Sequence, residues 1–184
     1  MNKNLKKLTV MGMLCAVSVV LVSFIHFPLF PAAPFLEYDP ADIPIFIGTF
    51  SFGPVAGLLL TVITSVIQGL TVSASSGLYG ILMHIISTGS FCLASGIIYK
   101  LKRTKKGAAL SLAVGTVTMT LGMIPANLFI TPLFMGTPTS VVAGLLLPAI
   151  IPFNFVKAAA NAVITFLLYK RISRLWNKDE IKGK

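Results

Sequence analysis

The stretch PFNFVKAAANAV, residues 152–163, places a lysine inside an apolar run that extends from about Val141 to Tyr169. The run is long enough for a membrane-spanning helix, which needs about 20 predominantly apolar residues. A lysine at the centre of such a helix costs at least about 2.5 kcal/mol, and ionisable residues found there are usually functional. The stretch therefore predicts a membrane protein with a functional site around Lys157.

The composition of the whole chain indicates an integral membrane protein. Its 184 residues are 55% hydrophobic and only 11% charged, and the mean hydropathy is +0.90. Soluble domains usually contain about 25% charged residues. Repeated long apolar stretches are typical of helical membrane proteins. No A-x-A-like site follows the first of them, so we do not expect a cleaved signal peptide.

The basic residues gather in three clusters that flank the apolar runs. A net charge of +10 would also suit nucleic-acid binding, but fourteen of the fifteen basic residues lie in these clusters and only Lys157 stands apart. Such clusters mark the cytoplasmic segments of membrane proteins, so we expect no nucleic-acid partner. The clusters are Lys3, Lys6 and Lys7; Lys100, Lys102, Arg103, Lys105 and Lys106; and Lys170, Arg171, Arg174, Lys178, Lys182 and Lys184.

The clusters predict an all-α membrane protein with six transmembrane helices and cytoplasmic N and C termini. An even number of crossings must separate successive cytoplasmic clusters. The stretch between the first and second clusters is long enough for four crossings, and the stretch between the second and third is long enough for two. The second span is too short to cross ~30 Å as a straight helix. We expect it to be short, tilted or partly buried, and to break at Gly53-Pro54. The single integral membrane domain, residues 1–184, has expected spans at about 8–30, 43–53, 54–71, 80–99, 108–130 and 142–169.

Lys157 shares one helical face with two asparagines. Asn154 precedes it by three residues and Asn161 follows it by four, so all three project from the same side. At ~1.5 Å per residue, Lys157 lies roughly 20 Å from the cytoplasmic boundary of its span. Snorkelling of the amine, or a structural ion pair with an acidic residue, would explain it without a ligand. We favour contact with a ligand, because this polar face must point at something other than lipid.

The segment FLEYDPADIP, residues 35–44, is expected on the outer side at about the depth of Asn127. Amide and charged groups beside an apolar wall are typical of small-molecule sites, and the nearby aromatic residues suit a flat, partly apolar ligand. Tyr38 is equally suited to be an anchor at the membrane interface. The candidate substrate-binding residues are Asn127, Asn154, Lys157, Asp39, Asp42, Tyr38 and Leu36.

Other polar residues within the spans have simpler explanations. We expect Ser65 and Gln68 to form hydrogen bonds between helices, and His84 to be a buried residue with satisfied hydrogen bonds. Cys15 and Cys92 are expected to be buried thiols. No phosphate-binding loop, metal-ligand motif or nucleophile–base arrangement is present, so we expect neither an enzyme nor a metal site.

Small residues four apart occur in two spans, at Gly12 and Ala16 and at Gly53 and Gly57. This spacing lets helices approach closely in lipid. Packing within the bundle and docking of a partner are equally good explanations. A partner would supply the energy source that the chain itself lacks.

The segments PFLEYDPADIPIFIGTFSFGPVAG (34–57), IPANLF (124–129) and PFNFVKAAANAV (152–163) resemble the riboflavin-binding S components of energy-coupling factor (ECF) transporters. The resemblance extends over nearly the whole chain. Its most specific parts are D-x-x-D-I-P followed by G-P-x-A-G, and N-x-x-K in the last span.

The resemblance implies a multi-pass subunit of a bacterial cell membrane that captures riboflavin or a related flavin from outside. It implies a transmembrane coupling subunit and two ATP-binding subunits as partners, and no cofactor besides the transported ligand. By resemblance, Asn127, Asn154 and Lys157 contact the flavin, whereas Gly12 and Ala16 dock the coupling subunit.

One departure leaves the specificity open. Riboflavin-binding members often have a glutamate and an asparagine in the fourth span where this chain has Leu82 and Ile85. An S component for FMN or another vitamin is therefore an alternative. A membrane scaffold or channel without a transported ligand is a further one.

Overall fold

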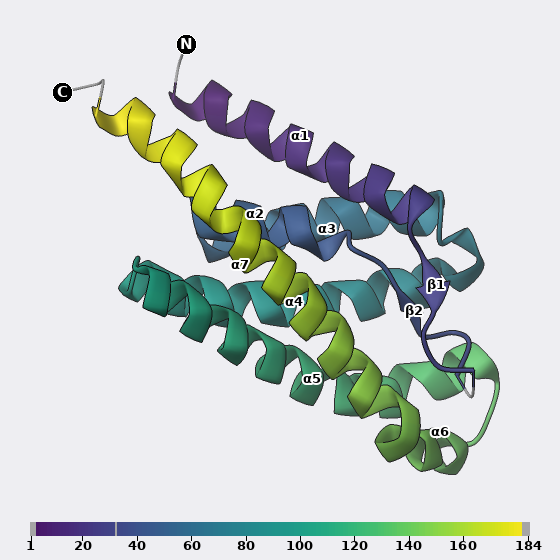
Figure 1. Cartoon of the computed structure of the whole chain (residues 1–184). Coiled ribbons are helices and arrows are strands. Elements are labelled where there is room, and N and C mark those ends of the chain that lie inside the picture. The colour runs from purple at the N-terminus through teal and green to yellow at the C-terminus, as the bar shows by residue number, and fades with distance from the viewer. Residues whose placement is uncertain (1–2, 32, 182–184) are drawn as a thin grey trace.

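The computed structural model describes residues 3–31 and 33–181, and this part of the chain is helical almost throughout (Figure 1). Of the third basic cluster, Lys182 and Lys184 lie outside the described residues. A 3₁₀ turn, Ala74–Ser76, precedes α4, and a π-helical turn, Leu146–Ile150, joins α6 to α7. The regular elements are α1 (Lys3–Phe24), β1 (Phe27–Pro28), β2 (Glu37–Tyr38), α2 (Asp42–Phe52), α3 (Pro54–Leu70), α4 (Gly77–Leu101), α5 (Lys105–Met135), α6 (Thr139–Leu145) and α7 (Ile151–Ile181).

The helices have the length and the surface of a membrane protein. Among the described residues, four segments are long and apolar enough to cross a membrane: Asn4–Phe24, Ala74–Leu101, Lys105–Met135 and Thr139–Leu168. Large apolar side chains such as Phe24 (84% exposed) and Leu147 (81% exposed) cover their outer faces. Soluble proteins rarely expose so much apolar surface. The bundle is therefore built to face lipid.

The bounds of several helices differ from the expected spans, and α7 continues to Ile181, beyond the expected end at 169. α1 ends at Phe24 instead of 30, because the chain leaves the helix to form β1 and Pro28 cannot donate a backbone hydrogen bond. α5 continues through Pro125 and Pro132 to Met135, beyond the expected end at 130. Membrane helices tolerate such prolines because neighbouring groups satisfy the freed carbonyls.

The break between α2 and α3 lies where the sequence predicts it. Gly53 has a φ of 94°, which favours glycine, and Pro54 occupies the first position of α3. α2 packs against α1, α3, α4 and α7. Its Ile45 and Phe46 are fully buried. The short helix is thus enclosed by longer ones instead of facing lipid.

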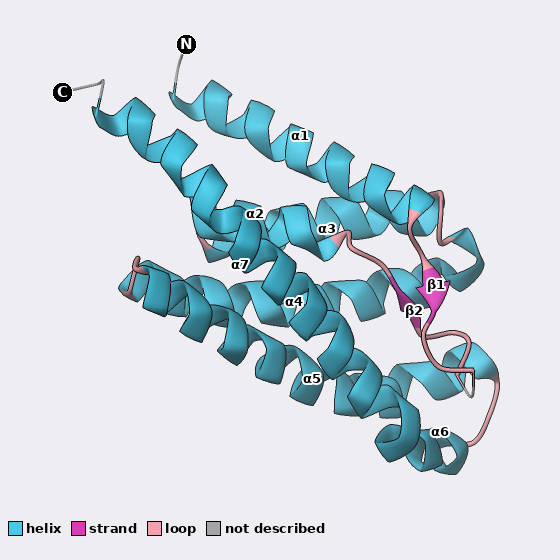
Figure 2. Ribbon diagram, in the orientation of Figure 1, coloured by secondary structure: helices cyan, strands magenta, loops and turns pink. Residues whose placement is uncertain are grey.

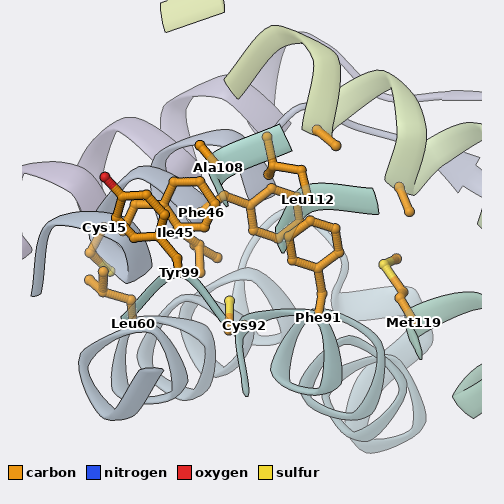
Figure 3. Close-up of a cluster of buried hydrophobic side chains, with 13 residues drawn as sticks. Cys15, Ile45, Phe46, Leu60, Phe91, Cys92, Tyr99, Ala108, Leu112 and Met119 are labelled. Atoms are coloured by element: carbon orange, nitrogen blue, oxygen red, sulfur yellow. The ribbon is translucent and has the colours of Figure 1, made fainter. Parts of the chain in front are cut away.

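Stacked aromatic rings join α2 to α4 in the main apolar core (Figure 3). The rings of Phe46 and Phe91 lie 3.7 Å apart between centroids, at 9° to each other. Phe50 and Tyr99 stack in the same way at 4.4 Å and 16°. Such pairs stabilise packing by about 0.5–1.5 kcal/mol beyond their buried area. This core fixes the position of α2, whose first residue is Asp42.

The two ends of the bundle differ. The start of α1, the α4–α5 turn and the end of α7 lie toward one end, and the three basic clusters belong to these segments (Figure 1). The β1–β2 pair, in which Phe27 lies opposite Tyr38, occupies the other end (Figure 2). A second apolar cluster, which includes Leu36, Ile150 and Phe153, packs the strand-connecting loop against the start of α7.

Candidate functional site

A cavity of about 180 Å³ lies at the end of the bundle that carries the β1–β2 pair. The segment around β2, the end of α3, the start of α4, the end of α5 and the start of α7 form its walls. Aromatic, leucine, isoleucine and methionine side chains supply much of the lining. The polar lining residues include Asp39, Gln68, His84, Asn127, Asn154 and Lys157.

Lys157 is paired with an acidic residue of the loop between β2 and α2. Its Nζ donates to Oδ2 of Asp39 at 2.6 Å, and each residue is 8% exposed. The backbone N–H of Ala41 donates to Oδ1 of Asp39 at 3.0 Å and so orients this carboxylate. This is the ion pair that the sequence left as an alternative to ligand contact. Both residues also line the cavity, so the ion pair is accessible from the cavity.

Asn161 connects α7 to the loop between β2 and α2, behind the cavity. Its Nδ2 donates to the backbone carbonyl of Asp39 at 3.0 Å and to Oδ2 of Asp42 at 3.2 Å. Its Oδ1 accepts from the hydroxyl of Tyr38 at 3.0 Å. Burial, together with the nearby carboxylate of Asp39, raises the pKa of Tyr38 above its ordinary value. The phenol therefore stays protonated and acts as a donor.

Asp42 lies in the same network and is fully buried. Its Oδ1 accepts from Thr88 Oγ1 at 2.7 Å and contacts Nε2 of His84 at 3.2 Å. Nδ1 of His84 is bonded in turn to Oγ of Ser65 at 2.6 Å. Ser65 thus makes the expected bond between helices, and His84 is satisfied as expected. Unexpectedly, His84 also lines the cavity.

Two of the seven predicted binding residues, Tyr38 and Asp42, do not line the cavity. Asp42 begins the enclosed helix α2, so its carboxylate points toward α4 and α7 and not toward the open space. Tyr38 is turned toward Asn161. Both residues instead position the groups that do line the cavity. The five predicted residues that do line the cavity are Leu36, Asp39, Asn127, Asn154 and Lys157.

Asn127 and Asn154 present amides to the cavity from two helices. Each Nδ2 donates to the carbonyl four residues earlier in its own helix, on Met123 and Ile150, at 2.8 Å. Thr131 donates to Oδ1 of Asn127 at 2.9 Å. Oδ1 of Asn154 accepts no hydrogen bond from any residue that the structure describes. Since an amide nitrogen has two hydrogens, each asparagine keeps capacity to bond a ligand.

The prediction for Gln68 is wrong. Its side chain forms no bond between helices: within the described part of the chain, its buried Nε2 has no partner. Gln68 lines the cavity with Ser65, which precedes it by one helical turn. This spacing of two polar residues on an apolar helix was the available signal, and sequence reasoning assigned it to helix packing.

The two pairs of small residues face different surroundings. Gly12 and Ala16 lie on the exposed face of α1, and a Cβ added to Gly12 would meet nothing within 4 Å. A Cβ on Gly57 would collide with Thr49, which shows close packing inside the bundle. Internal packing therefore explains Gly57 and does not explain Gly12.

The described residues show no cluster suited to a metal ion. In residues 3–31 and 33–181, no group of three or more His, Cys, Asp or Glu side chains is arranged to hold one. Cys15 and Cys92 are buried free thiols, as expected.

Comparison with known proteins points to one family. A model of the family described as "ECF transporter, substrate-specific component" matches residues 6–169. The riboflavin transporter RibU of Staphylococcus aureus (strain TCH60) is 30% identical, with 94% of this chain and 93% of the relative covered. The riboflavin transporter FmnP of Bacillus subtilis (strain 168) is 32% identical, with 92% of this chain and 93% of the relative covered. A solved structure of the S component of a bacterial ECF transporter superposes with a TM-score of 0.82 at 31% identity, and covers 95% of this chain and 99% of its own.

Proposed function

We propose a riboflavin-capturing function for this chain, which belongs to the family of substrate-specific components (S components) of ECF transporters. It is a transport protein and not an enzyme. Relatives that cover nearly its whole length are named riboflavin transporters. The observation that carries the proposal is the cavity in which Asn127, Asn154 and Lys157, from two helices, meet Asp39 of the outer loop.

The chemistry of a flavin suits this lining. The isoalloxazine ring is flat and largely apolar, and one edge alternates carbonyl oxygens with ring nitrogens. The amides of Asn127 and Asn154 supply both donors and acceptors for such an edge. The Asp39–Lys157 pair supplies charged partners for ring or ribityl oxygens and hydroxyls. A polar group left unpaired in the site would cost about 1–3 kcal/mol, which disfavours ligands that lack the matching groups.

The proposed topology is a multi-pass protein of the bacterial cell membrane, with six spans in the single domain 1–184 and both termini in the cytoplasm. Its support is that the start of α1, the α4–α5 turn and the end of α7, the described segments that carry basic clusters, lie toward one end of the bundle, opposite the cavity. Cytoplasmic segments are rich in lysine and arginine. This orientation would open the cavity to the outside, where an uptake subunit must capture its substrate.

The proposed assembly contains a transmembrane coupling subunit and two ATP-binding subunits. The exposed Gly12–Ala16 face of α1 would dock the coupling subunit, because small side chains allow another helix to approach closely. Hydrolysis of ATP by the partners would drive release of riboflavin inward.

The test is titration of the purified protein with riboflavin, followed by quenching of flavin fluorescence. We expect saturable binding, and binding at least about tenfold weaker for Asn154→Ala. Asn154 bonds only to its own helix, so this change should leave the fold intact. Val156→Ala, on the exposed face of α7, is the matched control and should bind like the unaltered protein.

Two results would contradict the proposal. One is an unaltered protein that leaves flavin fluorescence unchanged at all concentrations. The other is a different vitamin, or FMN, as the ligand that co-purifies with the protein in mass spectrometry.

A further inference from the structure

The side chain of Gln68 is the one buried cavity amide whose nitrogen has no partner among the described residues. Gln68 is 6% exposed and lies near the end of α3. Its backbone carbonyl accepts from the N–H groups of Thr71 at 3.1 Å and Ser73 at 2.8 Å. The backbone is therefore held firmly, while the amide nitrogen at the end of the side chain has no partner among the described residues.

A buried amide nitrogen without a protein partner needs an explanation, because native proteins pair almost all of their buried polar groups. Two neighbouring polar side chains do have protein partners: Ser65 bonds to Thr61 and His84, and Asn127 bonds to Met123 and Thr131. An apolar side chain would fill the place of Gln68 without leaving any group unpaired. The amide is therefore useful only if something else enters the cavity.

The position of Gln68 is fixed by close helix packing. Its neighbour Gly69 lies so near Ile81 of α4 that an added Cβ would collide with that side chain. The terminal torsion of glutamine is soft, so the amide can turn its oxygen or its nitrogen toward the cavity without moving the helix. A ligand can therefore find either a donor or an acceptor at this point of the wall.

We propose that the amide of Gln68 is a further ligand-binding group, which pairs with a carbonyl, ring nitrogen or hydroxyl of the bound flavin. This inference rests on the proposed riboflavin-binding function. It adds α3 to the elements that contact the ligand. Because no described residue of the protein pairs with Nε2 of Gln68, this nitrogen is available to a ligand without breaking a bond inside the protein.

The test compares Gln68→Met with the unaltered protein in two measurements, riboflavin affinity and melting temperature without ligand. Methionine keeps the length of the side chain and removes its polar atoms. We expect the dissociation constant to rise about tenfold, which corresponds to about 1.4 kcal/mol. We expect the melting temperature without riboflavin to stay the same or to rise, because an unpaired buried group has been removed. Gln68→Leu should behave in the same way.

Ile67→Met is the matched control. Ile67 is the neighbouring residue but is 38% exposed on the outer face of α3, so both measurements should be unchanged.

Each other outcome overturns the inference. Unchanged riboflavin affinity in Gln68→Met excludes a ligand contact. A lower melting temperature without ligand, or failure of both variants to fold, shows that Gln68 has a structural role. If the unaltered protein does not bind riboflavin, the proposed function fails and this inference fails with it. Binding by the unaltered protein with equal binding by both variants overturns this inference alone.

Discussion

Lys157 and Asp39 show how two charges become tolerable in an apolar bundle. Each would be strongly unfavourable alone in this environment, but at 2.6 Å they satisfy each other. Removing one partner of a buried pair typically costs about 3–5 kcal/mol, because the other charge is left uncompensated. A single substitution at Lys157 therefore changes stability as well as the ligand site, and it is a poor test of binding by itself.

We expect Lys157→Met to lower the melting temperature of the empty protein, and addition of Asp39→Asn to restore much of the loss. The double variant has no unpaired charge, yet it still lacks the amine and should bind riboflavin weakly. Melting curves of the four proteins, with and without riboflavin, form a double-mutant cycle. Additive losses in the empty protein would mean that the two side chains do not act as a pair.

The sequence predicted part of this site and missed another part for a physical reason. Spacing along one helix placed Asn154 and Lys157 on a common face, and both line the cavity. Spacing cannot tell which distant residue meets that face, so it did not separate Asp39, which lines the cavity, from Asp42, which lies behind it. For Gln68, the sequence showed a polar residue but could not show that no other residue pairs with it.

At the scale of elements, the enclosed helix α2 organises the site. Its 11 residues extend only about 16 Å, which is too short to cross a bilayer. The sequence predicted the short length and the break at Gly53-Pro54. It allowed for partial burial but could not show that α1, α3, α4 and α7 surround the helix, because the burial of a uniformly apolar helix depends on its neighbours. Enclosure is what brings Asp42 against Thr88 and Asn161.

Two glycines test the distinction between packing inside the bundle and docking outside it. Gly57→Leu should destabilise the protein by several kcal/mol or prevent folding, because the new side chain collides with Thr49 and Cys92. Gly12→Leu should leave melting temperature and riboflavin binding unchanged, but should strongly reduce ATP-driven uptake by the assembled transporter.

The measurements are melting temperature, riboflavin titration and uptake in vesicles that contain the coupling and ATP-binding subunits. Normal uptake with Gly12→Leu would remove the docking role from this face of α1. A stable, well-folded Gly57→Leu protein would contradict the close packing of α2 and α3.

At the scale of the whole molecule, charge and cavity are separated along the bundle. The segments with the basic clusters lie toward one end, and the acidic loop between β2 and α2 lies at the other end beside the cavity. The sequence predicted this arrangement, since the alternation of basic clusters and apolar runs is a property of the chain order. The shape of the cavity was not predictable, because five separate segments of the chain form its walls.

The modest length of α3 has a consequence for the surrounding lipid. Its outward face is apolar from Val55 (69% exposed) to Leu70 (73% exposed). Yet its 17 residues extend only about 26 Å, short of the ~30 Å hydrocarbon thickness. Because α4 and α5 are longer, with 25 and 31 residues, the bilayer must be thinner beside α3 than beside these two helices. We expect the melting temperature in nanodiscs to be higher with short acyl chains than with long ones, so that membrane composition adjusts the stability of the capture site. Equal melting temperatures across the series of acyl-chain lengths would show that the mismatch between α3 and the bilayer is accommodated in another way.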